Sequence, residues 1–154
     1  MRKLREQEII FIMQITNKFT IAVHVIVATK FFENKVKITS FFLAGSIGGN
    51  PALIRSVMRG LKAAGIIHTQ PLSEGIRIAK PLDAVTFYDV YKAVDCVGEK
   101  GIFHFHENPN PKCPVGKNIH AALDDKLKII QTAMEESMKK ITIADVMNEL
   151  ANEI

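Results

Sequence analysis

Two short amphipathic helices separated by a turn with glycines are predicted within residues 38–65, and this segment constrains the fold more than any other. The second helix has a clear start, because the Asn50 side chain can accept a hydrogen bond from a free amide and Pro51 suits the first helical position. An apolar stripe then follows at positions i, i+3, i+4 and i+7, formed by Ile54, Val57, Met58 and Leu61. This pattern is typical of a helix-turn-helix.

The opposite side of the second predicted helix is polar and cationic. In a helix-turn-helix, the start of the second helix enters the major groove of DNA, where side chains reach base edges and phosphates. The formal charge of +4 and a pI near 9.1 give only weak support, and an ordinary solvated helix face is the alternative. The DNA-contacting residues expected on this helix are Asn50, Pro51, Arg55, Ser56, Arg59 and Lys62.

The segments on either side predict a winged helix. Apolar residues at helical spacing predict a first helix over residues 17–32. After the second predicted helix, residues 66–70 and 76–79 are predicted to pair as strands around a turn at 71–75. Three helices followed by a hairpin form a mainly α fold with a small β-hairpin wing, and Arg77 in the wing is a further expected DNA contact.

A helix capped by Thr86 closes this domain near Asp95, and a loop with several glycines and prolines follows. A long helix is then predicted from Pro114, and Thr142 opens a last short helix with a capping box. The long helix has an apolar stripe of about six turns, which is too long for one small domain to cover. We therefore expect it to pair with the same helix of a second subunit, through Ile119, Leu123, Leu127, Ile130, Met134 and Met138.

The expected organisation is a winged helix-turn-helix domain at 13–95, a sensor-like loop at 96–113, and the dimerisation and C-terminal helices at 114–154. Residues 1–12 are charged and lack a helix cap, so either Met13 is the genuine start or these residues add an ordinary helical turn. No run of 18 apolar residues and no signal-peptide core occurs, and we expect a cytoplasmic protein without a membrane partner.

Cys96 and Cys113 are too few for a disulfide framework and are expected to be free thiols in a reducing cytosol. Cys113 precedes a proline and should cap the long helix, where free amides and the helix dipole favour a thiolate. Lys112 and Lys117 are expected to act in the same direction. Cys113 is thus the first sensor candidate and Cys96 the second, the alternatives being an inert cap and a buried small apolar residue.

Two loop histidines, His104 and His106, raise the alternative of a transition-metal site with Cys113 or His120. The spacing is unspecific, and exposed loop histidines are the simpler interpretation, so we predict no metal. The sequence contains no glycine-rich phosphate loop, no nucleophile elbow and no carboxylate pair in a pocket-like pattern. An enzyme is therefore not expected.

Several segments together resemble the Rrf2 (BadM/IscR-like) family of bacterial transcription regulators. They are residues 18–24 in the first helix, 43–51 at the turn, 61–67 before the wing and 82–95 after it. The resemblance runs from Met13 to the end of the chain. It implies a dimeric winged-helix regulator from a family that includes iron–sulfur cluster regulators and cysteine-metabolism repressors.

The chain departs from that family pattern at two places. Cluster-binding members usually carry three cysteines before the long helix and often a histidine three residues later. Here Cys113 occupies the third position, Gly116 stands where the histidine would be, and Cys96 comes too early. Two thiolates do not hold a typical cluster, so we expect no cofactor. The wing also lacks the paired glycines of the family, and Glu74 would repel phosphate.

These observations lead to the expectation of a homodimeric repressor that binds double-stranded DNA at a pseudo-palindromic operator and responds to thiol oxidation through Cys113. Two alternatives stay open. One is a winged-helix module for protein contact without specific DNA binding. The other is a metal-responsive regulator that uses histidines and cysteines of the loop.

Overall fold

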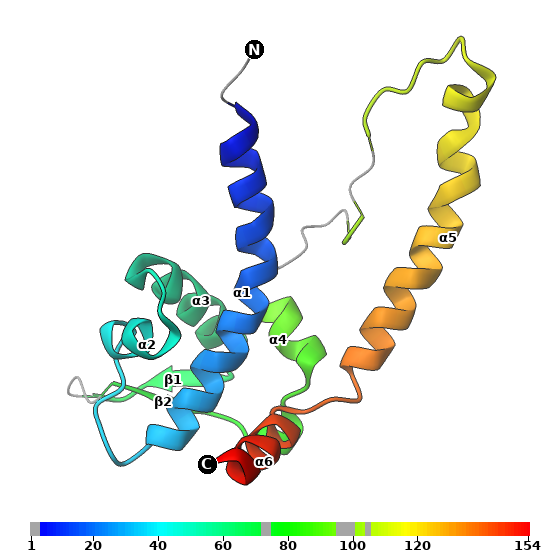
Figure 1. Cartoon of the computed structure of the whole chain (residues 1–154). Helices are drawn as coiled ribbons and strands as arrows, with labels where there is room; N and C mark the ends of the chain where they lie inside the picture. The colour runs from blue at the N-terminus through cyan, green and yellow to red at the C-terminus, as the bar shows by residue number, and fades with distance from the viewer. Residues whose placement is uncertain (1–3, 72–74, 95–100, 104–105) are drawn as a thin grey trace.

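The computed structural model describes residues 4–71, 75–94, 101–103 and 106–154, with residues 4–16 described as backbone only. The protein is mainly helical with a small antiparallel hairpin and a long helix near its C-terminus, as predicted (Figure 1). Its elements in chain order are α1 (Leu4–Phe32), α2 (Ser40–Ile47), α3 (Pro51–Ala63), β1 (Ile67–Thr69), β2 (Ile76–Ile78), the 3-10 helix η2 (Leu82–Ala84), α4 (Phe87–Ala93), α5 (Pro114–Met138) and α6 (Ile143–Glu153).

Helix α1 is longer than predicted, because it begins at Leu4. The prediction of a start near Asn17 is wrong, and residues 4–12 belong to the same helix. Neither glycine nor proline occurs between Leu4 and Asn17, so nothing in the sequence interrupts the helix there. The Thr20 hydroxyl donates to the Asn17 carbonyl oxygen (3.1 Å), a hydrogen bond to the preceding turn of the same helix.

The C-terminal half of α1 is the centre of the hydrophobic core. It packs against α2, α3, α4, α6 and β2, and Figure 1 shows these elements gathered around it. The predicted apolar stripe of α3 is buried in this core, where Ile54 and Leu61 have no exposed surface. Thr29 of α1 is buried too, and its hydroxyl is satisfied by donating to the Val25 carbonyl oxygen (2.6 Å).

The predicted wing forms, with β1 and β2 paired in the register Ile67 to Ile78. The chain before α2 joins it, because the Ile76 N–H donates to the Ile38 carbonyl oxygen (3.1 Å). Gly75 has a φ of 91°, and a side chain there would collide with the Ile38 backbone, so glycine is required at this crossing. Residues 72–74, which include Glu74, lie outside the described part of the chain.

The C-terminal segment returns to the core beside α4. The Phe87 N–H donates to the Ile141 carbonyl oxygen (2.8 Å), and the Ile143 N–H donates to the Val85 carbonyl oxygen (2.9 Å). A capping box begins each of the two helices that follow these bonds, with Thr86 before α4 and Thr142 before α6. Helix α6 consequently packs on α1 and η2.

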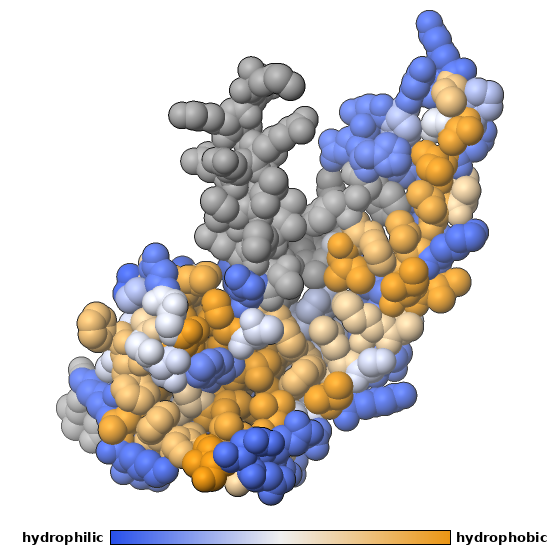
Figure 2. All heavy atoms as spheres, viewed as in Figure 1, coloured by the Kyte–Doolittle hydropathy of each residue, from blue (hydrophilic) through white to orange (hydrophobic). Residues whose placement is uncertain are grey.

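Helix α5 extends away from this core as a long arm (Figure 1). Its predicted stripe is divided between two environments: Met134 and Met138 pack against the core of the same chain, whereas Ile130 is 52% exposed. Two further apolar side chains outside that stripe are more exposed, Val115 at 67% and Ile129 at 69%. Figure 2 shows apolar side chains on the surface of this arm.

Gly60 provides a test of the packing between α3 and α4, because a Cβ at this position would overlap the Ala93 carbonyl group. We expect Gly60→Ala to destabilise the protein by about 1–3 kcal/mol, as overpacking does. The matched control is Gly45→Ala in α2, where a Cβ meets nothing within 4 Å. The control should be neutral or stabilising by up to about 1 kcal/mol, since alanine is the better helix former. Urea unfolding measures both, and equal stability of the two variants would contradict the close approach.

Candidate nucleic-acid interface

The turn between α2 and α3 begins with a well-capped α2. The Phe42 N–H donates to Thr39 Oγ1 (3.1 Å) at the first turn of the helix. At the other end, Gly48 adopts the left-handed conformation (φ 72°, ψ 33°) and its N–H donates to the Ala44 carbonyl oxygen (2.9 Å). A glycine cap of this kind ends the helix and redirects the chain. The start of α3 is thereby set at an angle to α2.

The start of α3 agrees with the sequence prediction. Asn50 Oδ1 accepts a hydrogen bond from the Ala52 N–H (2.8 Å), and Pro51 occupies the first helical position. The Asn50 side chain is thus engaged with the helix amide while the residue stays exposed. Its role in the structure is to fix where α3 begins.

The two faces of α3 are separated as predicted. Ile54, Val57, Met58 and Leu61 face the core, and all four are buried. Arg55, Arg59 and Lys62 are exposed on the other side, and Ser56 and Pro51 are half-buried at its edge. None of the three cations forms a hydrogen bond or ion pair with the described residues. Their charges are free to meet a ligand.

The helix-turn-helix lies in a long stretch of sequence without acidic side chains. From Lys35 to Ser73 the chain contains five lysines and arginines and no aspartate or glutamate. These cations are Lys35, Lys37, Arg55, Arg59 and Lys62. Because this stretch has cations and no carboxylates of its own, its net positive charge exceeds that of the chain as a whole, and a positive charge attracts a polyanion.

Arg77, the expected contact in the wing, is half-buried and donates from Nη1 to Asn34 Oδ1 (2.7 Å). Asn34 has a φ of 68° in the turn after α1, so the pair fastens the wing to that turn. One guanidinium donor of Arg77 is therefore already used in a hydrogen bond within the protein. The Arg77 side chain is thus held in place by a hydrogen bond within the protein, whereas Arg55 and Arg59 of α3 form no such bond with the described residues.

Two polar contacts that sequence reasoning missed brace the interface. The Lys80 ammonium donates to the Ala64 carbonyl oxygen (3.1 Å) and so caps the C-terminal end of α3. His24 Nε2 lies 3.1 Å from Ser46 Oγ, which joins α1 to α2. Both contacts join residues at least 16 positions apart, and no local pattern signals them.

Cys113 occupies the N-cap of α5, as predicted, and is half-exposed. The backbone N–H groups of Gly116 and Val115 in the first turn lower the pKa of its thiol. Contrary to expectation, the lysines at 112 and 117 are not among the causes of this shift. The thiolate is favoured by the free end of the helix, and the half-exposed sulfur lies within reach of reagents.

Cys96 and His104 lie outside the described residues. His106 stacks on His120 with the ring centroids 5.5 Å apart and the planes 24° apart, and His120 lies 3.6 Å from Asp124. In the described part of the chain, no group of three histidine, cysteine or acidic side chains is placed to hold a metal ion. The histidines described in this region form a stack on the surface of α5.

A family model decides what kind of protein carries this interface. The Rrf2 model, described as an iron-dependent transcriptional regulator, matches residues 15–149. The chain belongs to the Rrf2 family. It is thus a transcriptional regulator, and the family and its named relatives are regulators rather than enzymes.

A curated relative of this Rrf2 regulator supports the same assignment, and two solved structures share its fold. The chain is 35% identical over 136 residues to YwnA of Bacillus subtilis (strain 168), which is named as an HTH-type transcriptional regulator, covering 88% of this chain and 98% of YwnA. A crystal structure of a transcriptional regulator from Lactobacillus plantarum superposes with a TM-score of 0.71 at 22% identity, covering 87% and 89% of the two chains. CymR, the global cysteine regulator of B. subtilis, has the same fold at a TM-score of 0.59 and 14% identity, covering 85% and 93%.

No helix in the described part of this Rrf2 regulator is both long enough and apolar enough to cross a membrane.

Proposed function

We propose that this Rrf2 regulator is a homodimeric repressor that reads a pseudo-palindromic DNA operator and responds to thiol oxidation at Cys113. The exposed cationic face of α3 carries the proposal, because its three cations have no partner among the described residues. A regulator bound across a promoter would exclude the polymerase, which is why repression is the expected effect.

The proposed docking follows from which face of α3 is turned toward solvent. With its apolar stripe buried, Arg55 and Arg59 project from the opposite side one turn apart. In this arrangement the first half of α3 would enter the major groove, and Lys62 at its end would meet the phosphate backbone. Arg77 and the wing would lie beside the adjacent backbone.

Removing both arginines tests this docking. The double variant Arg55→Ala, Arg59→Ala should weaken operator binding by at least about tenfold, because each DNA-contacting arginine contributes about 1–3 kcal/mol. Its unfolding midpoint should not change, since neither side chain is in the core. Fluorescence anisotropy with the protein's own promoter, at two salt concentrations, measures the affinity and its salt dependence.

The matched control is Lys126→Ala, Lys140→Ala, which removes the same charge from exposed positions outside the helix-turn-helix. It should bind DNA nearly as well as the wild type. Equal losses for the two double variants would contradict docking through α3. A wild-type protein that binds no DNA at all would instead favour the module for protein contact.

Dimerisation is supported by the exposed apolar side of α5. Val115, Ala122 and Ile129 recur at intervals of seven residues and are all exposed, with Ile130 beside them. Side chains seven residues apart lie two turns apart on one side of a helix, so these three form an exposed apolar row against which a second helix could pack. The helix has 25 residues, about 37 Å at 1.5 Å per residue, so two copies could meet over a long seam. A two-fold dimer presents two recognition helices, hence a pseudo-palindromic operator.

Placing a charge in this seam tests the dimer. Ile129→Glu should shift the protein from dimer to monomer, because two carboxylates would be brought together in an apolar contact. The control is Phe41→Glu, which alters an 81% exposed apolar side chain on α2 and should leave the dimer intact. Light scattering after gel filtration measures the mass, and a dimeric Ile129→Glu protein would contradict the seam.

The redox response rests on the half-exposed thiol of Cys113 at the start of the same helix. Its lowered pKa increases the thiolate fraction near neutral pH, and the thiolate is the species that reacts with oxidants. Modification at this cap would alter the first turn of α5 and thereby the spacing of the two recognition helices in a dimer.

Cys113→Ser separates this chemistry from the capping role, because serine is also a good N-cap. Hydrogen peroxide, which oxidises a single thiolate to a sulfenic acid, should change the DNA affinity of the wild type and of Cys96→Ser, whereas the DNA affinity of Cys113→Ser should not respond. Alkylation of the wild type by iodoacetamide should also persist to lower pH than for an ordinary thiol, whose pKa is about 8.5. A Cys113→Ser protein whose DNA affinity still responds to hydrogen peroxide would refute the sensor role.

A further inference from the structure

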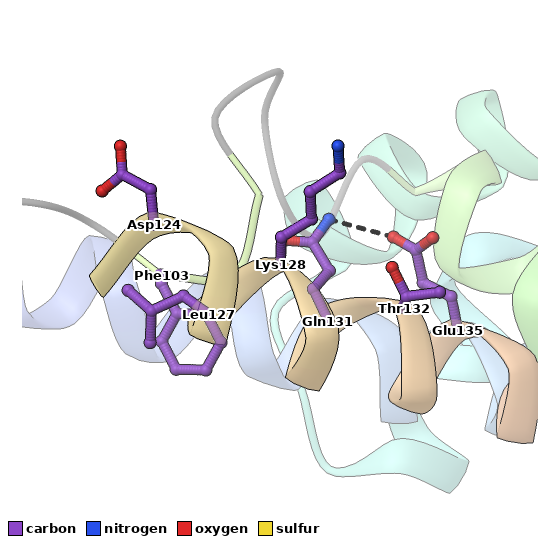
Figure 3. A pocket seen from close by; sticks show the side chains of 7 residues that line it. All are labelled: Phe103, Asp124, Leu127, Lys128, Gln131, Thr132 and Glu135. Carbon is purple, nitrogen blue, oxygen red and sulfur yellow. Dashed lines mark hydrogen bonds between the residues drawn. The ribbon is translucent and has the colours of Figure 1, made fainter. Parts of the chain in front are cut away.

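A hollow of about 380 Å³ lies on the surface of α5 next to residues 101–103 (Figure 3). These three residues are held on the helix by Gln131, whose Oε1 accepts a hydrogen bond from the Ile102 N–H (3.2 Å). Gly101 is buried with a φ of 81°, and a side chain there would collide with the Gln131 amide. Phe103, which lines the hollow, therefore follows a residue whose backbone is hydrogen-bonded to α5.

One part of the hollow is apolar. Phe103 and Leu127 both line it, and their side chains overlap in the view of Figure 3. Both are only half-buried, so they present apolar surface to whatever enters. An aromatic or branched side chain of a ligand would cover this surface and remove it from water.

The polar part of the hollow carries charges that alternate along α5. Asp124, Lys128 and Glu135 follow one another along the helix, and Figure 3 shows Asp124 and Glu135 at opposite ends. Glu135 already accepts a hydrogen bond from Gln131 Nε2 (3.0 Å). Lys128 forms no hydrogen bond or ion pair with any described residue, and Asp124 has only His120 at 3.6 Å. One cation and one carboxylate, a helical turn apart, are therefore available.

We propose that this hollow binds a zwitterionic α-amino acid with a bulky apolar side chain. The ligand carboxylate meets the Lys128 ammonium, with the Thr132 hydroxyl one turn further along as a second donor. The ligand ammonium meets Asp124, and the apolar side chain lies over Phe103 and Leu127. Each charged group of the ligand then has an opposite charge, and the apolar group has an apolar wall.

Singly charged ligands fit this charge pattern less well. An anion would gain Lys128 but lie near two carboxylates, and a cation would gain Asp124 but lie near Lys128. The hollow is also on a different side of α5 from the seam of Val115, Ala122 and Ile129, none of which lines it. Occupancy of the hollow and pairing of two α5 helices are compatible.

Three probes that share a benzyl group test the proposal: L-phenylalanine, 3-phenylpropionate and 2-phenylethylamine. NMR titration of the isotope-labelled full chain, without DNA, measures their affinities. Phenylalanine should bind about two- to fivefold more tightly than either singly charged probe, the range expected for an exposed charge pair. Because no DNA is present, failure of this test is distinct from failure of the proposed operator binding.

Two variants assign the probe groups to the side chains. Lys128→Gln should weaken phenylalanine and phenylpropionate by about two- to fivefold and should not weaken phenylethylamine. Phe103→Ala should weaken all three probes, since it removes the shared apolar wall. The matched control is Lys126→Gln, a lysine of α5 that does not line the hollow, and it should change none of them.

Three results would overturn the proposal. One is the absence of saturable binding of phenylalanine. Another is phenylalanine binding no tighter than the better of the two singly charged probes. The third is Lys128→Gln behaving in the same way as Lys126→Gln, which would show that the ammonium of Lys128 does not meet the ligand.

Discussion

Burial of the α3 stripe against α1 is the interaction on which the rest of this protein depends. Ile54, Val57 and Leu61 have almost no exposed surface, and each such side chain contributes about 1.5–3 kcal/mol when buried. A helix held by one stripe cannot rotate about its axis without exposing that stripe. The same burial that stabilises the domain therefore directs Arg55 and Arg59 outward.

Packing also connects α5 to α3. Helix α3 meets α4 where Gly60 lies against the Ala93 backbone, and α4 meets the end of α5 through Tyr88. The Lys139 ammonium lies 4.9 Å from the centre of the Tyr88 ring and also pairs with Glu136 (2.6 Å). Cys113 is at the opposite end of α5. A chemical change at one end of the arm thus has a continuous path of packed elements toward α3.

Local signals in the sequence account for most of the fold. The Asn50 cap, the stripe of α3 and the capping box at Thr142 act over a few residues, and the structure has them as predicted. The start of α1 was missed because the apolar residues at helical spacing were followed only from residue 17 onward, whereas no glycine or proline interrupts the helix before it.

The sequence by itself determined which helices form, where most of them begin and end, and which face of α3 is apolar. These properties depend on the periodicity of apolar residues and on residues close in sequence, and both can be read directly from the amino-acid sequence. Only the tertiary structure decided that Asn34 holds Arg77, that the stripe of α5 is partly covered by its own chain, and that Gln131 holds Ile102 to form a hollow. Each of these contacts joins distant segments, and a side chain finds such a partner only after the backbone has brought the two segments together.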